Sequence, residues 1–134
     1  MDYTIVFDGG SRGNPGVGYG SYQIVRSRDG KTRLRRLEFP GTSTTNNEAE
    51  YMTLIAALEE LTTGIEKAGA SPRALTVEVK GDSQLVLKQL EGAWQVREPR
   101  LAPLRDKALA LLRQFRQAKL TWQRRAKSVE VLGH

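Results

Sequence analysis

The chain has 134 residues, enough for a single domain over residues 1–134 with its own hydrophobic core. It has no cysteine, which excludes disulfides and thiolate metal sites, and no apolar run of about 18 residues, which excludes a membrane-spanning helix. We therefore expect a cytoplasmic protein with no membrane partner. The net charge is +6, and residues 97–127 hold ten Lys or Arg against two acidic residues, which favours a polyanionic partner over an ordinary solvated helix face.

The first third of the chain is typical of three consecutive strands. Apolar alternation predicts strands over residues 3–7, 17–25 and 31–39. The turn sequence Asp29-Gly30 joins the second strand to the third, as in a hairpin.

Helices and strands alternate in the rest of the chain. Thr44 and Thr45 can cap a helix that runs to about Glu66 and is broken near Gly64. Four further elements are predicted: a strand over 75–80, a short helix over 83–90, a helix after Pro99 and a short strand over 120–122. The order βββαβααβ, followed by a tail, predicts an α/β fold in which helices pack on a mixed five-stranded sheet.

The first acidic residue of interest, Asp8, follows the first predicted strand and opens a glycine-rich loop. A carboxylate in this place lies at a sheet edge, where the sites of open α/β sheets form. Gly9 and the glycines after it allow a phosphate to approach the backbone. A tight hairpin turn capped by Asp8 fits the pattern equally well, and the loop is not a P-loop because no Gly-Lys-Ser/Thr follows.

The second acidic residue, Glu50, lies on the apolar side of the long predicted helix. It shares a helical stripe with Leu54, Ala57, Leu58 and Leu61, so it should face the sheet and need a partner there. Glu48 points away from this stripe, where it can interact with the helix dipole from solvent. Asn46 and Asn47 stand at the helix start, either as caps or as hydrogen-bonding groups for a sugar or base edge.

The third acidic residue, Asp82, repeats the arrangement of Asp8: a strand, a glycine, a carboxylate and then a helix cap. Asp82 alone could be an ordinary charge at a helix N-terminus. Three such carboxylates are best explained if they converge on a divalent cation, since Mg²⁺ takes oxygen ligands and two-metal sites carry out phosphoryl transfer.

Together the three motifs resemble those of type 1 ribonuclease H. They are Asp8-Gly-Gly-Ser-x-Gly-Asn-Pro-Gly, Thr-Asn-Asn-x-Ala-Glu50-Tyr and Gly-Asp82-Ser-Gln, in the family's order and spacing over residues 3–125. The resemblance implies a ribonuclease H-like fold and an endonuclease that uses two Mg²⁺ or Mn²⁺ ions to cut the RNA strand of an RNA–DNA hybrid, leaving 5′-phosphate and 3′-hydroxyl ends. The family's basic protrusion is absent, as in its shorter bacterial and archaeal forms.

The resemblance also implies roles for single residues. Asp8, Glu50 and Asp82 match three metal ligands of the family. Asn14, Asn47 and Gln84 match positions that contact sugars and bases of the hybrid. The candidate substrate-binding residues are these three together with Gly9, Ser11, Asn46 and Arg125.

The C-terminal segment departs from the family pattern, which supplies a fourth carboxylate, an Asp, after the last strand. No Asp follows Asp106. An ungapped match puts Leu132 near that position, a two-residue deletion puts Glu130 there, and His134 is close behind. Glu130 could bind Mg²⁺, His134 would suit Mn²⁺ better, or the segment could be a frayed tail without a ligand.

Three functions therefore stay open at this point. The first is hybrid cleavage, which the intact set of three carboxylates favours. The second is a non-catalytic module that binds hybrids or double-stranded RNA. The third is a nuclease of the same fold that acts on double-stranded RNA. In each case we expect a monomer.

Overall fold

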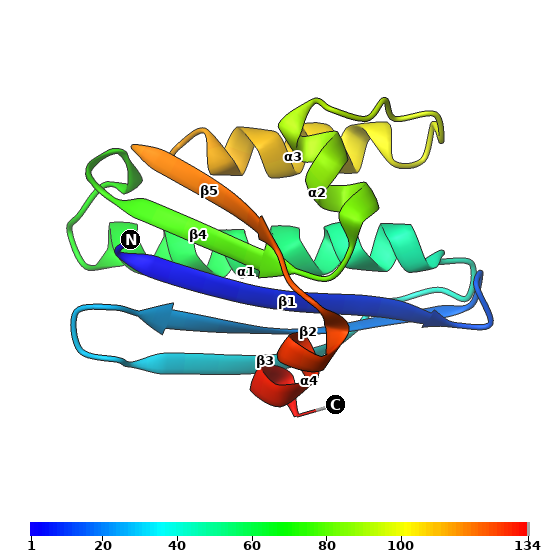
Figure 1. Ribbon diagram of the computed structural model, residues 1–134, viewed down its shortest axis with the longest axis horizontal. Helices are drawn as coiled ribbons and strands as arrows, with labels where there is room; N and C mark the ends of the chain where they lie inside the picture. Colours follow the sequence, from blue (N-terminus) through cyan, green and yellow to red (C-terminus); the bar gives the residue numbers. More distant parts are fainter. Residues whose placement is uncertain (134) are drawn as a thin grey trace.

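The computed structural model describes residues 1–133, which form one five-stranded mixed sheet with helices on both faces (Figure 1). The strands lie in the order β3-β2-β1-β4-β5, with β1, β2 and β3 antiparallel and β1, β4 and β5 parallel. The elements are β1 (Tyr3–Arg12), β2 (Val17–Arg26), β3 (Thr32–Glu38), α1 (Asn46–Lys67), a 3₁₀ turn (Pro72–Ala74), β4 (Thr76–Gly81), α2 (Gln84–Glu91), α3 (Ala102–Leu112), β5 (Gln117–Trp122) and α4 (Arg125–Leu132). The predicted fold class and five-stranded sheet are confirmed.

The core lies between the sheet and α1, which runs behind it in Figure 1 with α3 alongside. Ile5 and Phe7 of β1 are fully buried there against the stripe of α1 that contains Leu54 and Leu58. This burial is the main stabilising contribution of the fold, at roughly 25 cal/mol for each Å² of apolar surface removed from water. No helix among residues 1–133 combines the length and apolar character that crossing a bilayer requires.

Strand β1 is longer than predicted, which changes the setting of Asp8. The sequence predicts a strand that ends at Phe7, but β2 pairs with β1 along its whole length, as far as Arg12 and Val17. Asp8 therefore lies inside a strand and not at its end. On the other side of β1, the ladder with β4 stops at Phe7 and Gly81. Asp8 is thus the first residue of β1 that has no paired residue of β4 beside it.

Helix α1 begins at the predicted cap but continues through Gly64. Thr45 and Glu48 form a capping box in which each side chain accepts a hydrogen bond from the other residue's backbone N–H. The predicted break near Gly64 is wrong because a glycine inside a helix costs only about 1 kcal/mol relative to alanine. Burial of Leu61 and Ile65 on either side of Gly64 outweighs that cost.

Gly9 allows the first turns of α1 to lie directly on β1. A Cβ atom at Gly9 would stand 2.6 Å from the backbone carbonyl of Ala49. We expect Gly9→Ala to lower the free energy of unfolding by roughly 2–4 kcal/mol, because two backbones would have to separate. Gly64→Ala is the matched control: nothing lies within 4 Å of its Cβ position, and the variant should gain about 0.5–1 kcal/mol. Denaturant unfolding measures both, and equal effects would contradict the close approach.

The segment after β5 folds into helix α4, where the sequence predicts only a tail. In Figure 1 this helix, in red, crosses the face of the sheet opposite α1. Leu132 is fully buried, the Arg36 side chain donates a hydrogen bond to the Leu132 carbonyl at 3.2 Å, and Gln123 donates one to Ser128 at 3.1 Å. Half of the residues of α4 are apolar, but only Leu132 among them is buried, so the helix has no wide apolar face of the kind by which a sequence predicts a helix.

Candidate metal centre

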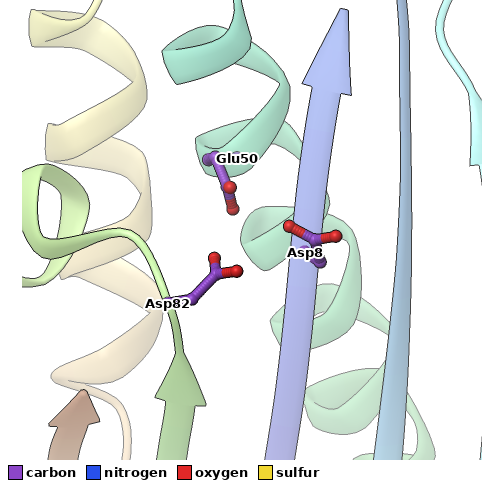
Figure 2. Close-up of side chains that lie close together, drawn as sticks. All are labelled: Asp8, Glu50 and Asp82. Carbon is purple, nitrogen blue, oxygen red and sulfur yellow. The ribbon is translucent and has the colours of Figure 1, made fainter. Parts of the chain in front are cut away.

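The three predicted carboxylates come together at one point of the fold. Asp8 projects from β1, Glu50 from α1 and Asp82 from the residue after β4, and their carboxylates face a common space (Figure 2). One oxygen of each lies within 4.8 Å of the others. Among residues 1–133 this is the group of acidic side chains that could hold a metal ion.

We refer to Asp8, Glu50 and Asp82 as the trio. Local structure holds Asp82 and Glu50 in place beside Asp8. Asp82 stands between the last residue of β4 and Ser83, which caps α2 by accepting a hydrogen bond from the Val86 N–H at 3.2 Å. The indole N–H of Trp122 donates to the Asp82 carbonyl at 3.2 Å, which ties β5 to the same turn. Glu50 reaches the space because α1 lies directly against Gly9.

Burial and like charge make this site unfavourable for three free carboxylates. Glu50 is only 8% exposed, and its Oε2 atom is buried with no hydrogen-bond partner among the described residues. Burial, and then the neighbouring charges of Asp8 and Asp82, hold the pKa of Glu50 well above its usual range. Burial and Asp8 also raise the pKa of Asp82, which Arg125 partly opposes.

A divalent cation fits these observations. It would give the buried Glu50 oxygen a partner and offset the repulsion between three converging carboxylates. All three donors are hard oxygen atoms, the ligands that Mg²⁺ and Mn²⁺ take in proteins.

Several predicted substrate-binding residues form a hydrogen-bonded rim beside the trio. The Asn46 side chain accepts from the Ser11 N–H at 2.8 Å, and the Asn14 side chain accepts from the Asn46 N–H at 3.0 Å. The Ser11 hydroxyl donates to the Thr44 carbonyl at 2.6 Å. The end of β1 and the loop after it are therefore held against the start of α1 by side chains that are predicted to bind substrate. Thr45, not an asparagine, caps the helix.

Of the remaining substrate-binding candidates, Gly9 lies in β1 next to Asp8, and the other three lie at helix starts. Asn47 and Gln84 are in the first turns of α1 and α2, half-buried and exposed respectively. Arg125 is the first residue of α4, and its charge acts on Asp82. All of them lie on elements that carry or adjoin the trio.

The structure does not bring Glu130 into the trio. Its side chain is 73% exposed and lies 3.9 Å from Lys127 on the surface of α4. Leu132, the residue at the ungapped position, is buried. The other candidate for a fourth ligand, His134, is outside the described residues.

The position of Glu130 gives a direct prediction. Glu130→Gln should change any metal-dependent activity less than about twofold, because exposed ion pairs contribute little. The initial rate at saturating and at limiting Mg²⁺ measures this. A loss of more than tenfold at limiting Mg²⁺ would show that Glu130 joins the metal site in the working protein.

The sequence does not predict the contact between Arg100, in the segment before α3, and the start of α1. The Arg100 side chain pairs with Glu48 at 3.0 Å and donates to the Ser43 carbonyl. The sequence predicts that Glu48 faces solvent, but the side chain is only 13% exposed because this ion pair and the capping box cover it. The two residues are far apart in the chain, and nothing in either local sequence marks them as partners.

Comparisons with known proteins agree with the geometry. The sequence model of the family described as reverse transcriptase-like matches residues 6–131. The ribonuclease HI of Halobacterium salinarum is 44% identical over 109 residues, which cover 81% of this chain and 50% of that protein. The bifunctional protein Rv2228c of Mycobacterium tuberculosis is 40% identical over 129 residues, which cover 96% of this chain and 33% of that protein. The chain thus spans a third to a half of the length of these curated relatives.

Solved structures are similar over nearly the whole chain. The crystal structure of RNase H1 from Halobacterium salinarum NRC-1 superposes with a TM-score of 0.78 at 38% identity, covering 94% of this chain and 88% of that one. The structure of LC11-RNase H1 in complex with an RNA/DNA hybrid gives a TM-score of 0.82 at 29% identity, covering 96% of this chain and 89% of that one.

Proposed function

Because the chain belongs to the type 1 ribonuclease H group of the reverse transcriptase-like family, we propose that it is a metal-dependent endonuclease acting on the RNA strand of RNA–DNA hybrids. The observation that carries the proposal is the trio of Asp8, Glu50 and Asp82, with ligand atoms within 4.8 Å of one another and a buried Glu50 oxygen that lacks a partner. The hybrid bound in the structure of LC11-RNase H1 supports the choice of substrate.

The three carboxylates would hold two divalent ions. When bound, such ions supply an activated water as nucleophile and stabilise the departing 3′ oxygen, which leaves 5′-phosphate and 3′-hydroxyl ends. The carboxylates themselves fix where this chemistry takes place. Asp8, in the middle of β1, sets the position, while Glu50 and Asp82 close the site from the α1 and β4 sides.

The side chains around the trio would orient the hybrid. Asn14, Asn47 and Gln84 offer amides for sugars and base edges, and Glu50 can meet a ribose 2′-hydroxyl, the group by which a protein distinguishes RNA from DNA. The basic residues of segment 97–127 would bind phosphates without regard to sequence. Nothing in this set requires a protein nucleophile.

Strand-labelled substrates test the proposal. The protein is incubated with an RNA–DNA hybrid, double-stranded RNA and double-stranded DNA of one sequence, in Mg²⁺, in Mn²⁺ and in EDTA. We expect cleavage confined to the RNA of the hybrid and abolished by EDTA. Cutting of double-stranded RNA at a comparable rate would broaden the substrate class. Binding without cutting in either metal would contradict an enzymatic role.

A further inference from the structure

A chain of two hydrogen bonds, the first of them buried, connects the helix that carries Glu50 to the helix that follows Asp82 and to the loop beyond it. The Tyr51 hydroxyl donates to the Gln89 side-chain oxygen at 2.7 Å, and the Gln89 amide donates to the Gln95 backbone carbonyl at 3.3 Å. Both side chains are buried, Tyr51 completely. We refer to Tyr51, Gln89 and the Gln95 carbonyl as the polar brace.

Hydrophobic packing does not explain why this pair is polar. Leu87 and Leu90, on the same helix as Gln89, belong to the apolar core, and Tyr51 lies in that core as well. A phenylalanine and a leucine would bury similar volume there without the cost of removing an amide and a hydroxyl from water. A hydrogen-bonded polar pair constrains the geometry, because it permits few relative placements of the two helices.

The relative placement of α1 and α2 needs such a constraint because no backbone hydrogen bonds of the sheet connect Glu50 to Asp82. The pairing of β1 with β4 ends at Phe7 and Gly81, one residue before each aspartate of the trio. Glu50 is on a helix outside the sheet altogether. Tyr51 directly follows Glu50, and Gln89 belongs to the short helix whose cap, Ser83, directly follows Asp82. The polar brace therefore joins the two elements whose separation sets the width of the site.

The brace also holds the loop that leaves α2. The Gln95 carbonyl lies in the segment between α2 and α3, next to Trp94, which is 46% exposed. At its far end, the same segment is tied to the start of α1 by Arg100, through Glu48 and the Ser43 carbonyl. Both ends of this loop are thus anchored toward the helix that carries Glu50.

We propose that Tyr51 and Gln89 are positioning residues for the carboxylate trio: their hydrogen bond fixes α1 against α2, and through them the spacing of Glu50 and Asp82. The inference deepens the proposed function and rests on the trio as its metal site. Neither residue is one of the three carboxylate ligands, so both act through the helices they join.

Three variants separate positioning from stability. Tyr51→Phe removes the hydroxyl and leaves the Gln89 oxygen buried without its donor. The double variant Tyr51→Phe/Gln89→Leu replaces both members by apolar groups, which restores stability when a hydrogen bond serves stability alone. Tyr22→Phe is the matched control, since the Tyr22 hydroxyl donates to Glu60 further along α1. Each protein is titrated with MnCl₂ while its thermal unfolding is followed in otherwise metal-free buffer, and its hybrid cleavage is measured in parallel.

The expected pattern differs between stability and metal binding. Tyr51→Phe should lower the Tm in EDTA by roughly 3–8 °C, and the double variant should recover most of that loss. The Mn²⁺ concentration for half-maximal stabilisation should rise about 3–10-fold in both, because supporting residues around a metal site affect its affinity. Tyr22→Phe should lower the Tm without moving that concentration.

A double variant with the Mn²⁺ midpoint and the cleavage rate of the parent, whatever its Tm, would overturn the inference. If Tyr51→Phe does not fold, the double variant alone decides the question. A parent protein that binds Mn²⁺ but does not cut hybrids would instead count against the proposed function, and the comparison of Mn²⁺ midpoints would still test the brace.

Discussion

Replacing Asp8 with asparagine should reduce hybrid cleavage by roughly 10³-fold or more, the scale seen when a central catalytic group is removed. Asparagine keeps the size of the side chain but removes the charge that would hold a cation between β1, α1 and β4. The fold should survive, because the neighbouring pairing of β1 with β2 involves backbone groups. Single-turnover cleavage of a labelled hybrid in Mg²⁺, with thermal unfolding of the same sample, measures both effects.

Asp106→Asn is the control for loss of one negative charge. The Asp106 side chain is 66% exposed, pairs with Arg105 at 2.8 Å and does not belong to the trio. This variant should cleave within about twofold of the parent, since an exposed pair contributes little. If Asp8→Asn also cleaves at the parent rate, the assignment of Asp8 to the metal site is wrong.

Glu50→Gln should abolish cleavage and, in EDTA at neutral pH, raise the Tm by roughly 3–6 °C. The native pKa of Glu50 lies above its unfolded value of 4.5, chiefly because of burial. Protonated Glu50 therefore favours the folded state, and its contribution to stability is full below pH 4.5 and is lost as the pH rises through the native pKa. The advantage of Glu50→Gln over the parent should thus grow with rising pH.

With Mg²⁺ present, the parent should have a higher Tm than Glu50→Gln, the reverse of their order in EDTA. The parent gains stability from Mg²⁺ because the ion binds only the folded state, and Glu50→Gln should gain less. Glu59→Gln is the control. The Glu59 side chain is on the same helix, is 51% exposed and pairs with Lys107 at 3.5 Å. This variant should neither raise the Tm in EDTA nor reduce the gain in Tm from Mg²⁺. A Glu50→Gln protein less stable than its parent in EDTA at every pH would contradict the raised pKa.

The sequence predicts the trio well because each carboxylate carries a local signal. Asp8 and Asp82 each follow an apolar run, and Glu50 interrupts the apolar stripe of a helix, so each is anomalous without knowledge of the others. The confirmed order of strands and helices then brings all three to one place.

The features that the sequence does not predict depend on distant partners. The extension of β1 to Arg12 requires β2 beside it, which overrides the turn propensity of Gly9 and Gly10. Helix α4 is held by Leu132 and by Arg36 from another strand. The hydrogen bond between Tyr51 and Gln89 joins two helices, and neither local pattern indicates a buried polar pair.

A crystal structure with Mn²⁺, located by its anomalous scattering, tests the metal centre directly. We predict Mn²⁺ bound by Asp8, Glu50 and Asp82, with the Glu50 Oε2 atom among its ligands. Anomalous peaks elsewhere and none at the trio, in a protein that cuts hybrids only with metal, would show that these three carboxylates do not form the metal centre.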